Sequence, residues 1–313
     1  MDNSGKRRSY AVIGTGGIGG YYGMKLAAAG FDVNFLFRSD YDAVLRDGYR
    51  LESVDGDVFL PAPRAYRSAE DMPRCDVILV CLKTTANSSL PSILKPLLHK
   101  ASVVVLIQNG LLVEEELSSA LPQARIIGAT AFICSSRIAP AHISHTAYGA
   151  LTLVPYSEGT QDVMAGIAED MKSAGIKVEL KDNYKSVRWR KLVWNIPYNG
   201  LSVALGSKTD FLTFNPHSRA LVRDLMMEVI AGAAACGVSI PESFADEMIA
   251  ATEVMVPYKP SMRLDYDAHR PMEIRAMYAN PVAEAARHCC PMPKVEALMQ
   301  LLSAIEEREQ TKV

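Results

Sequence analysis

A glycine-rich turn near the N-terminus constrains the fold of this chain more than any other feature. Residues 9–14 (SYAVIG) can form a buried strand, and they lead into Gly14, Gly16 and Gly19 in the order GxGxxG. Residues 17–29 then show the pattern of a helix. The first glycine of such a turn permits the tight bend, the second lets backbone approach a pyrophosphate, and the third lets the helix pack on the strand. The pattern predicts a dinucleotide site at the N-terminus of this helix.

The rest of the first 183 residues supports this reading over a glycine turn that binds nothing. Short apolar runs alternate with amphipathic stretches, and several runs are apolar throughout, as parallel strands buried on both faces are. We therefore expect a doubly wound, mostly parallel Rossmann sheet of the α/β class. The expected strands are 9–14, 31–37, 75–83, 101–110, 124–133 and 176–182, the expected helices are 17–29, 112–120 and 160–174, and 142–155 is expected to form an antiparallel pair.

From about residue 184 the sequence shows helical periodicity and little else. A chain of 313 residues is longer than one core usually supports. We expect a dinucleotide-binding domain at 1–183 and an all-α domain at 184–313. The helices predicted for the second domain are 186–206, 215–237, 241–256, 269–288 with an interruption at Pro281, and 293–308.

The composition is that of an ordinary globular protein, with 49% hydrophobic residues and a net charge of -2. This balance predicts no nucleic-acid or membrane partner. The basic residues near the N-terminus precede too short an apolar run for a secretory signal. Six cysteines without a CxxC pair indicate reduced thiols and a cytoplasmic location. No metal site is expected, since His142 and His145 should point to opposite faces of a strand.

The residues after the second predicted strand bear on the choice of cofactor. A carboxylate there would bind the ribose hydroxyls of NAD and repel a 2′-phosphate, whereas this chain has Arg38 followed by Ser39. NADP is therefore favoured. Asp40 lies two residues further and keeps NAD as the alternative, with Arg38 then a solvated side chain.

Two other predicted strands end in polar residues. One delivers Lys83, and the next delivers Gln108, Asn109 and Gly110. Ligands of an open parallel sheet lie beyond the carboxyl ends of its strands, so these groups are expected near a nicotinamide. The plain alternative is that strand ends are polar because they emerge into water.

A polar stripe interrupts the apolar segment WRKLVWNIPYNG at 189–200. Lys191, Asn195 and Asn199 recur every fourth residue, which places them along one edge of a helix. A merely solvated edge would favour Glu and Lys over asparagine, a weaker helix former. The stripe therefore indicates a site, with an ordinary domain contact as the alternative. Pro197 should bend this helix.

These motifs, in this order, resemble the ketopantoate reductase family, that is, the 2-dehydropantoate 2-reductases. The resemblance runs over most of the chain through GTGGIGG, CLKT, QNG, WRKLVWNIPYN and PSMRLDYDAHRPMEI. It implies a Rossmann domain followed by an all-α domain similar to those of 6-phosphogluconate dehydrogenases. The last motif matches the family pattern at Ser261, Met262, Asp265, Arg270 and Glu273.

The resemblance implies NADPH-dependent reduction of ketopantoate, a small 2-oxo acid, to pantoate in pantothenate and coenzyme A biosynthesis. It makes Lys191 the catalytic lysine and Glu273 the group that binds the substrate hydroxyl. Lys191 would give a proton to the carbonyl oxygen, and a nearby carboxylate would keep it charged. The implied substrate contacts are Asn109, Asn195, Asn199 and Ser261. The implied cofactor contacts are Gly14, Thr15, Gly16, Gly17, Ile18, Gly19, Arg38, Lys83 and Asn109.

Two departures from the family pattern leave the substrate open. Family members usually have an Asn-Gly pair where this chain has Tyr278 and Ala279, and Pro197 is also unusual. The alternatives are another 2-oxo acid, a hydroxy acid oxidised as in the 6-phosphogluconate relatives, or a non-catalytic NADP-binding sensor. The sequence does not fix the oligomeric state, and we expect a homodimer.

Overall fold

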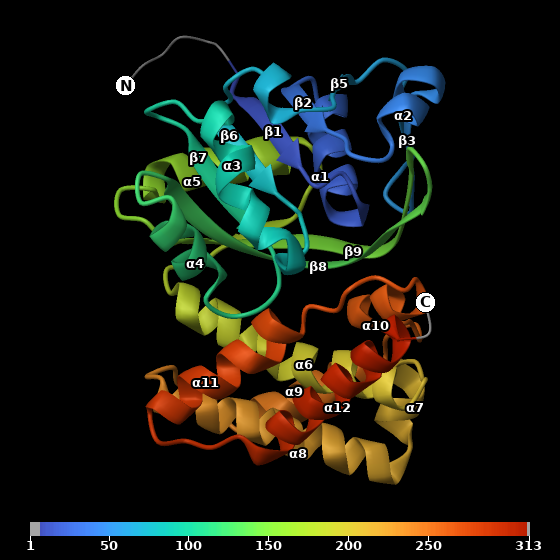
Figure 1. Cartoon of the computed structure of the whole chain (residues 1–313), viewed down its shortest axis with the longest axis vertical. Coiled ribbons are helices and arrows are strands. Elements are labelled where there is room, and N and C mark those ends of the chain that lie inside the picture. The colour runs from blue at the N-terminus through green and yellow to red at the C-terminus, as the bar shows by residue number, and fades with distance from the viewer. Residues whose placement is uncertain (1–6, 312–313) are drawn as a thin grey trace. The chain divides into compact units, whose positions relative to one another are not determined.

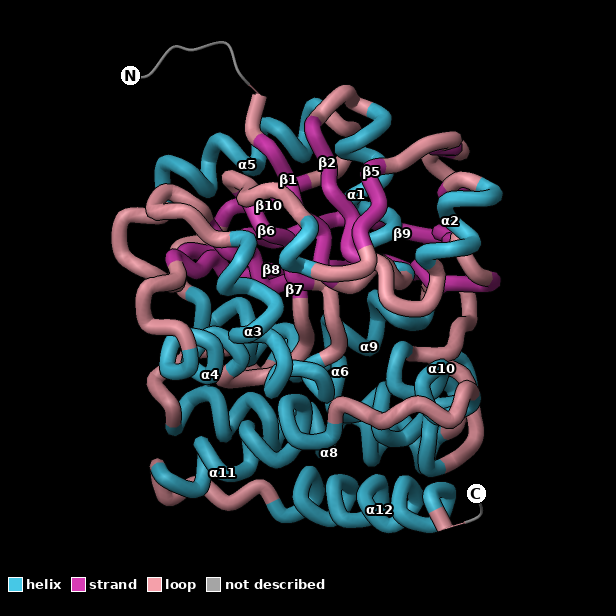
Figure 2. The backbone as a smooth tube through the Cα atoms, turned by 45° about the horizontal axis from the view of Figure 1, so that its top comes forward, coloured by secondary structure: helices cyan, strands magenta, loops and turns pink. Residues whose placement is uncertain are grey.

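The computed structural model describes residues 7–311, so the first six residues, with part of the basic N-terminal stretch, lie outside it. The chain divides into two compact units. The sheet unit holds the chain up to Gln108 together with Val113–Tyr184, and the helical unit holds Asn109–Leu112 together with the chain from Lys185 onward. Figure 2 shows the strands gathered in the first unit and helices making up the second.

Six parallel strands form the core of the sheet unit. Their order is β5-β2-β1-β6-β7-β8, the order of a doubly wound Rossmann sheet, which confirms the expected fold class. β6 and β7 are buried at every residue, which explains why their sequences are apolar throughout. The strands are β1 (Ser9–Ile13), β2 (Asp32–Leu36), β5 (Arg64–Tyr66), β6 (Val77–Val80), β7 (Val103–Ile107) and β8 (Arg125–Ala139).

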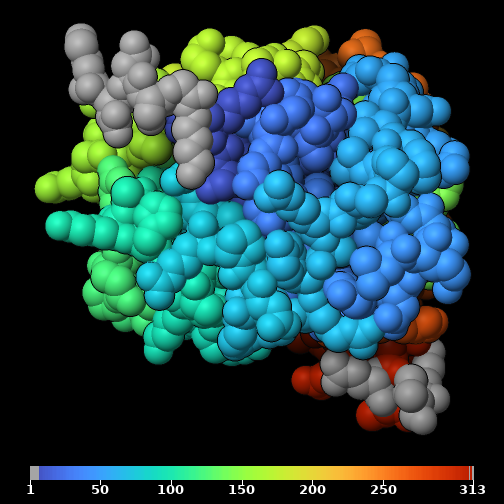
Figure 3. All heavy atoms as spheres, turned by 90° about the horizontal axis from the view of Figure 1, so that it is seen from above, coloured from blue at the N-terminus to red at the C-terminus, as the bar shows by residue number. Residues whose placement is uncertain are grey.

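The sheet continues beyond β8 and curls around α1 (Gly17–Ala28) as a half-barrel, because α1 contacts β1 and β2 as well as β8, β9 and β4. β9 (His142–Pro155) pairs antiparallel with β8 (Figure 1), and β3 (Tyr49–Ser53), β4 (Val58–Leu60) and β10 (Val178–Leu180) complete this part. In Figure 3 the first third of the chain, blue to cyan, forms a continuous face of the unit. The helices are α2 (Tyr41–Asp47), α3 (Leu90–Leu94), α4 (Val113–Ala120) and α5 (Gln161–Ser173).

The prediction of an antiparallel pair within 142–155 is wrong. This segment is the single strand β9, and its antiparallel partner is β8, which runs to Ala139 rather than ending at residue 133. Tyr148 and Gly149 have φ of 68° and 117°. These positive angles coincide with a register shift against Phe132 and Ile133, so they make a β-bulge and not a chain reversal.

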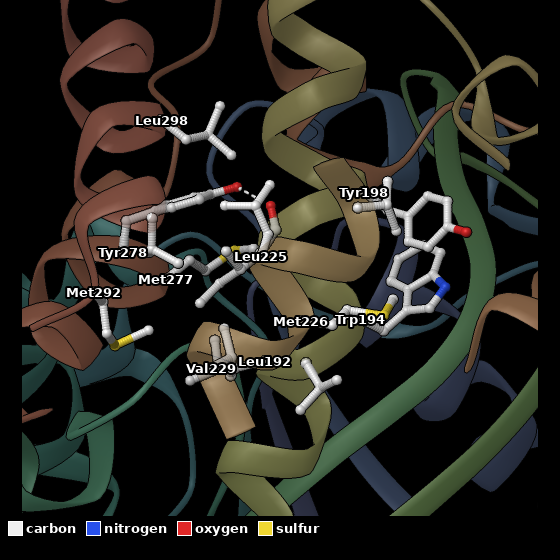
Figure 4. Packing of buried hydrophobic residues seen from close by; sticks show 14 of the residues in the cluster. Leu192, Trp194, Tyr198, Leu225, Met226, Val229, Met277, Tyr278, Met292 and Leu298 are labelled. Atoms are coloured by element: carbon white, nitrogen blue, oxygen red, sulfur yellow. Dashed lines mark hydrogen bonds between the residues drawn. The ribbon is translucent and has the colours of Figure 1, made fainter. Parts of the chain in front are cut away.

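The helical unit is built around α6 (Tyr184–Ala204), whose apolar side chains pack against α8 (Pro216–Ala235), as Figure 4 shows for Leu192, Leu225 and Val229. Asn215 begins α8 as an N-cap, its side chain accepting hydrogen bonds from the N–H groups of His217 and Ser218. No helix within residues 7–311 is long and apolar enough to cross a membrane. The remaining helices are α7 (Thr209–Phe214), α9 (Ser243–Glu253), α10 (Ser261–Asp267), α11 (Asn280–Arg287) and α12 (Pro293–Gln310).

The helix expected at 269–288 differs from the observed one. Residues 269–273 are not helical, and a π-helical turn at Arg275–Ala279 leads into α11. Pro281 does not interrupt the helix, since it occupies the first turn of α11, where proline is tolerated. The irregularity lies before the proline, where the π-helical turn adds a residue to the helical path.

Candidate functional site

Of the three GxGxxG glycines between β1 and α1, two occupy tight positions and one an open position. Gly14 has φ +94°, and a Cβ there would lie 2.6 Å from the backbone nitrogen of Leu82. A Cβ at Gly19 would lie 2.2 Å from the carbonyl oxygen of Gly14, whereas a Cβ at Gly16 would meet nothing within 4 Å. Gly14 and Gly19 are therefore required by the fold, and the space at Gly16 leaves room for a ligand.

The turn is held from several sides by side chains of the sheet unit. Tyr49 donates a 2.9 Å hydrogen bond to the carbonyl of Thr15, and Ser135 donates one of 2.9 Å to the carbonyl of Gly17. Ile18 packs on the sheet core. The N-cap of α1 is Gly16, which has no side chain to cap the first N–H groups of the helix. The first N–H groups of α1, at the positive end of its dipole, therefore suit a pyrophosphate.

The residues after β2 differ in exposure and in partners. Arg38 is exposed and, among residues 7–311, has neither a hydrogen-bond nor an ion-pair partner. Asp40 is only 5% exposed. One oxygen of its carboxylate accepts hydrogen bonds from Arg137 and, at 2.8 Å, from Ser39, and the other accepts one of 3.1 Å from the N–H of Ala141. Arg38 is thus available to an anion, and Asp40 is not available to ribose hydroxyls.

Lys83 lies three residues after the end of β6 and is exposed at the start of a 3₁₀ turn, Thr84–Ser89. Gln108, at the end of β7, donates from Nε2 to the carbonyl of Leu82 and to Oδ1 of Asn87, both at 2.8 Å. Gln108 therefore holds the backbone at Leu82, just before Lys83. Its role in the structure is to fix this loop.

In the helical unit the structure brings together the four residues assigned to the substrate. Asn195 donates from Nδ2 to Oδ1 of Asn109 at 3.4 Å. Oδ1 of Asn199 accepts from the N–H of Met262 at 2.9 Å and from the hydroxyl of Ser261 at 3.3 Å. Asn195 and Asn199 are 3% and 2% exposed, so this is a buried polar cluster and not a solvated helix edge. Lys191 lies one turn before Asn195 on α6 and is partly buried.

Glu273 is 4% exposed and lies two residues before the π-helical turn at Arg275–Ala279. The segment that carries Asn109 is held against this turn. Gly110 has φ +99°, a Cβ there would lie 2.6 Å from that of Ala276, and the N–H of Leu111 donates to the carbonyl of Ala276 at 2.9 Å. Turns of this kind are often found at functional sites.

α6 continues through Pro197 as one helix. Tyr278 donates from its hydroxyl to the carbonyl of Ile196 at 2.9 Å (Figure 4). Its ring is fully buried, and burial raises the pKa of its hydroxyl above the usual range. Tyr278 therefore ties the π-helical turn to the part of α6 that contains Pro197.

Sequence reasoning missed Ser135 and Arg137, which come from the extension of β8 and contact Gly17 and Asp40. No local pattern marks them. Their positions follow from the antiparallel pairing of β8 with β9, which carries β8 past the glycine turn.

Comparison with known families decides the relationship. The family model described as "Ketopantoate reductase PanE/ApbA" matches residues 10–158, and the model of its C-terminal part matches residues 183–306. The chain belongs to the ketopantoate reductase family. It is therefore a member of a family of oxidoreductases that depend on a nicotinamide dinucleotide.

Relatives of known name agree with this family. The 2-dehydropantoate 2-reductase of Nostoc sp. PCC 7120 is 45% identical over 97% of each chain. The crystal structure of 2-dehydropantoate 2-reductase from Geobacter metallireducens matches with a TM-score of 0.91 and 38% identity, over 95% of this chain and 99% of that one. D-mandelate dehydrogenase with NADH shares the fold at a TM-score of 0.86 and 19% identity, over 96% of this chain and 99% of that one.

Proposed function

We propose that this chain reduces 2-dehydropantoate to pantoate with NADPH, a step of pantothenate and coenzyme A biosynthesis. The observation that carries the proposal is the polar cluster in which the buried Asn195 and Asn199 bond to the partly buried Asn109 and Ser261. Lys191 lies on the same edge of α6. These are the residue types that a small acid held by dipoles and one cation requires.

The residues of the sheet unit fit a dinucleotide. NADPH, when bound, supplies the hydride for the carbonyl carbon of the substrate. The N-terminus of α1 would hold the pyrophosphate at the open position of Gly16, and Arg38 would bind the 2′-phosphate. Lys83 is proposed to lie near the nicotinamide. The same fold binds NADH in D-mandelate dehydrogenase, so the fold alone does not choose between the two cofactors. The support for NADP comes from Arg38, whose exposed side chain is available to the 2′-phosphate. A higher kcat/KM with NADH than with NADPH would overturn this assignment.

The hydrogen bonds of the cluster leave donors for a substrate carboxylate. Asn109 accepts from Asn195 through its oxygen, which leaves its amide nitrogen for a ligand. The bond from Ser261 to Asn199 is long at 3.3 Å, and the N–H of Met262 also satisfies this oxygen. The Ser261 hydroxyl can therefore turn to a carboxylate without leaving Asn199 unpaired. Asn199 is best described as a residue that positions Ser261.

Lys191 is proposed as the acid that protonates the carbonyl oxygen, and Glu273 as the acceptor for the substrate hydroxyl. Removing a general acid should cost about 100-fold or more in kcat, so Lys191→Ala should lose at least that much. Lys191→Arg keeps the charge but holds its proton too tightly to give it up, so it should regain substrate affinity without regaining kcat. Steady-state kinetics that show normal kcat and only a raised KM for Lys191→Ala would make Lys191 a binding group instead.

The substrate is tested by NADPH oxidation with 2-dehydropantoate beside pyruvate and 2-oxoisovalerate. We expect the highest kcat/KM with 2-dehydropantoate. Reduction of a different 2-oxo acid is the second candidate. The bulky, buried Tyr278 next to the Glu273 segment favours it, because the family resemblance implies a smaller asparagine at this position. No NADPH oxidation with any of the three acids would favour a non-catalytic NADP sensor.

The assembly and the location are also proposals. Exposed apolar side chains of the helical unit, among them Phe211, Phe214 and Val256, support a homodimer. Light scattering after gel filtration would measure its mass. All six cysteines are free, which supports a cytoplasmic location.

A further inference from the structure

The ion pair between Asp40 and Arg137 lies beside Arg38 and joins residues far apart in the sequence. Asp40 follows β2, and Arg137 lies on the extension of β8, 97 residues later. Nη1 of Arg137 also lies 3.2 Å from the hydroxyl of Ser39. The side chain of Asp40 is 6% exposed, and that of Arg137 is 43% exposed.

A carboxylate at this place in a Rossmann fold has a defined effect on the cofactor. Free to move, it would accept hydrogen bonds from a ribose and repel a 2′-phosphate. In this chain both oxygens of Asp40 are engaged, one by Arg137 and Ser39 and the other by the N–H of Ala141. Ala141 has φ 58° in the turn between β8 and β9, so this bond also fixes the turn.

We propose that Arg137 is a specificity-determining residue, which selects NADP by holding Asp40 in place and neutralising its charge. This inference rests on the proposed use of NADP. Arg137 acts through Asp40 and is therefore a positioning residue, and Arg38 remains the residue that binds the phosphate. Without Arg137 a carboxylate would face the 2′-phosphate uncompensated and could turn to the ribose hydroxyls of NAD.

Calorimetric titration of the full chain with 2′,5′-ADP and with 5′-AMP tests this, and titration with NADPH and NADH repeats the test on intact cofactors. Arg137→Ala removes the charge that neutralises Asp40, so it should lower the preference for 2′,5′-ADP over 5′-AMP by about tenfold or more. Arg137→Lys keeps the charge and should retain most of the preference.

The double variant Arg137→Ala with Asp40→Asn separates the positioning role from a direct contact. If Arg137 acts through Asp40, removing the carboxylate charge should restore most of the lost preference. An unchanged preference in Arg137→Ala, or a loss that Asp40→Asn does not restore, would overturn the inference. If the wild-type chain itself binds 5′-AMP and NADH as tightly as 2′,5′-ADP and NADPH, the proposed cofactor fails instead. Thermal unfolding of each variant checks that it is folded.

Discussion

At the scale of residues, Gly16 and Gly19 allow ligand binding and folding to be tested separately. Gly19→Ala places a Cβ 2.2 Å from a backbone oxygen, so it should lower the free energy of unfolding by about 1–3 kcal/mol or more. Gly16→Ala meets no neighbour within 4 Å and has an extended backbone. Its stability should change by less than about 0.5 kcal/mol, while its Kd for NADPH should rise about tenfold because the new methyl group blocks the pyrophosphate.

Thermal unfolding and NADPH titration of the two variants measure these effects. Normal NADPH binding by Gly16→Ala, or unfolding of Gly16→Ala as easily as Gly19→Ala, would contradict the separate roles of these two glycines.

Residues whose arrangement depends on local spacing could be predicted from the sequence, and residues brought together over long distances in the chain could not. The glycine turn and the Lys191, Asn195 and Asn199 stripe were visible because a turn and a helix fix the relation between near neighbours. The engagement of Asp40 was not visible, because its partner Arg137 is brought there by strand pairing 97 residues later. That is why the sequence left NAD open on the strength of Asp40 alone.

At the scale of elements, α6 and the π-helical turn are joined by the Tyr278 hydroxyl, which bonds to the carbonyl of Ile196 next to Pro197. Tyr278→Phe removes this buried bond and should cost about 1 kcal/mol of stability. Since the π-helical turn follows Glu273, we also expect a changed kcat/KM for the 2-oxo acid.

Tyr198→Phe is the matched control for Tyr278→Phe. Its hydroxyl lies 3.0 Å from that of Thr213, also buried, so the loss of stability should be similar. Urea unfolding and steady-state kinetics of both variants compare them. Equal kinetic effects in the two would mean that Tyr278 does not position the Glu273 segment.

Among the helices and strands too, some could be predicted from the sequence and others could not. Five of the six parallel strands, β1, β2, β6, β7 and β8, could be predicted because burial makes their sequences largely apolar. The edge strand β5 (Arg64–Tyr66) could not, because it is only three residues long and none of them is fully buried. The length of β8, the bulge at Tyr148 and the π-helical turn could not, because positive φ angles at non-glycine residues and an extra residue in a helix leave no periodic signal.

At the scale of the whole molecule, the segment Asn109–Leu112 leaves the sheet unit and joins the helical unit before the chain returns at Val113. Leu111 is 3% exposed in the helical core, whereas Ile107, four residues earlier, is 5% exposed in the sheet core. A single boundary near residue 183 leaves this segment in the first unit, and four residues are too few to show a change of pattern.

The placement of this segment predicts that two neighbouring substitutions weaken different units. Leu111→Ala and Ile107→Ala each remove a buried aliphatic side chain and should each cost about 2–5 kcal/mol. Hydrogen exchange followed by mass spectrometry should show faster exchange in α6 and the π-helical turn for Leu111→Ala, and in β1, β6 and β7 for Ile107→Ala. The same peptides exchanging faster in both variants would mean that the chain unfolds as one unit. With the expected pattern, Leu111→Ala should also raise the KM for the 2-oxo acid more than Ile107→Ala does, because Leu111 anchors the segment that carries Asn109.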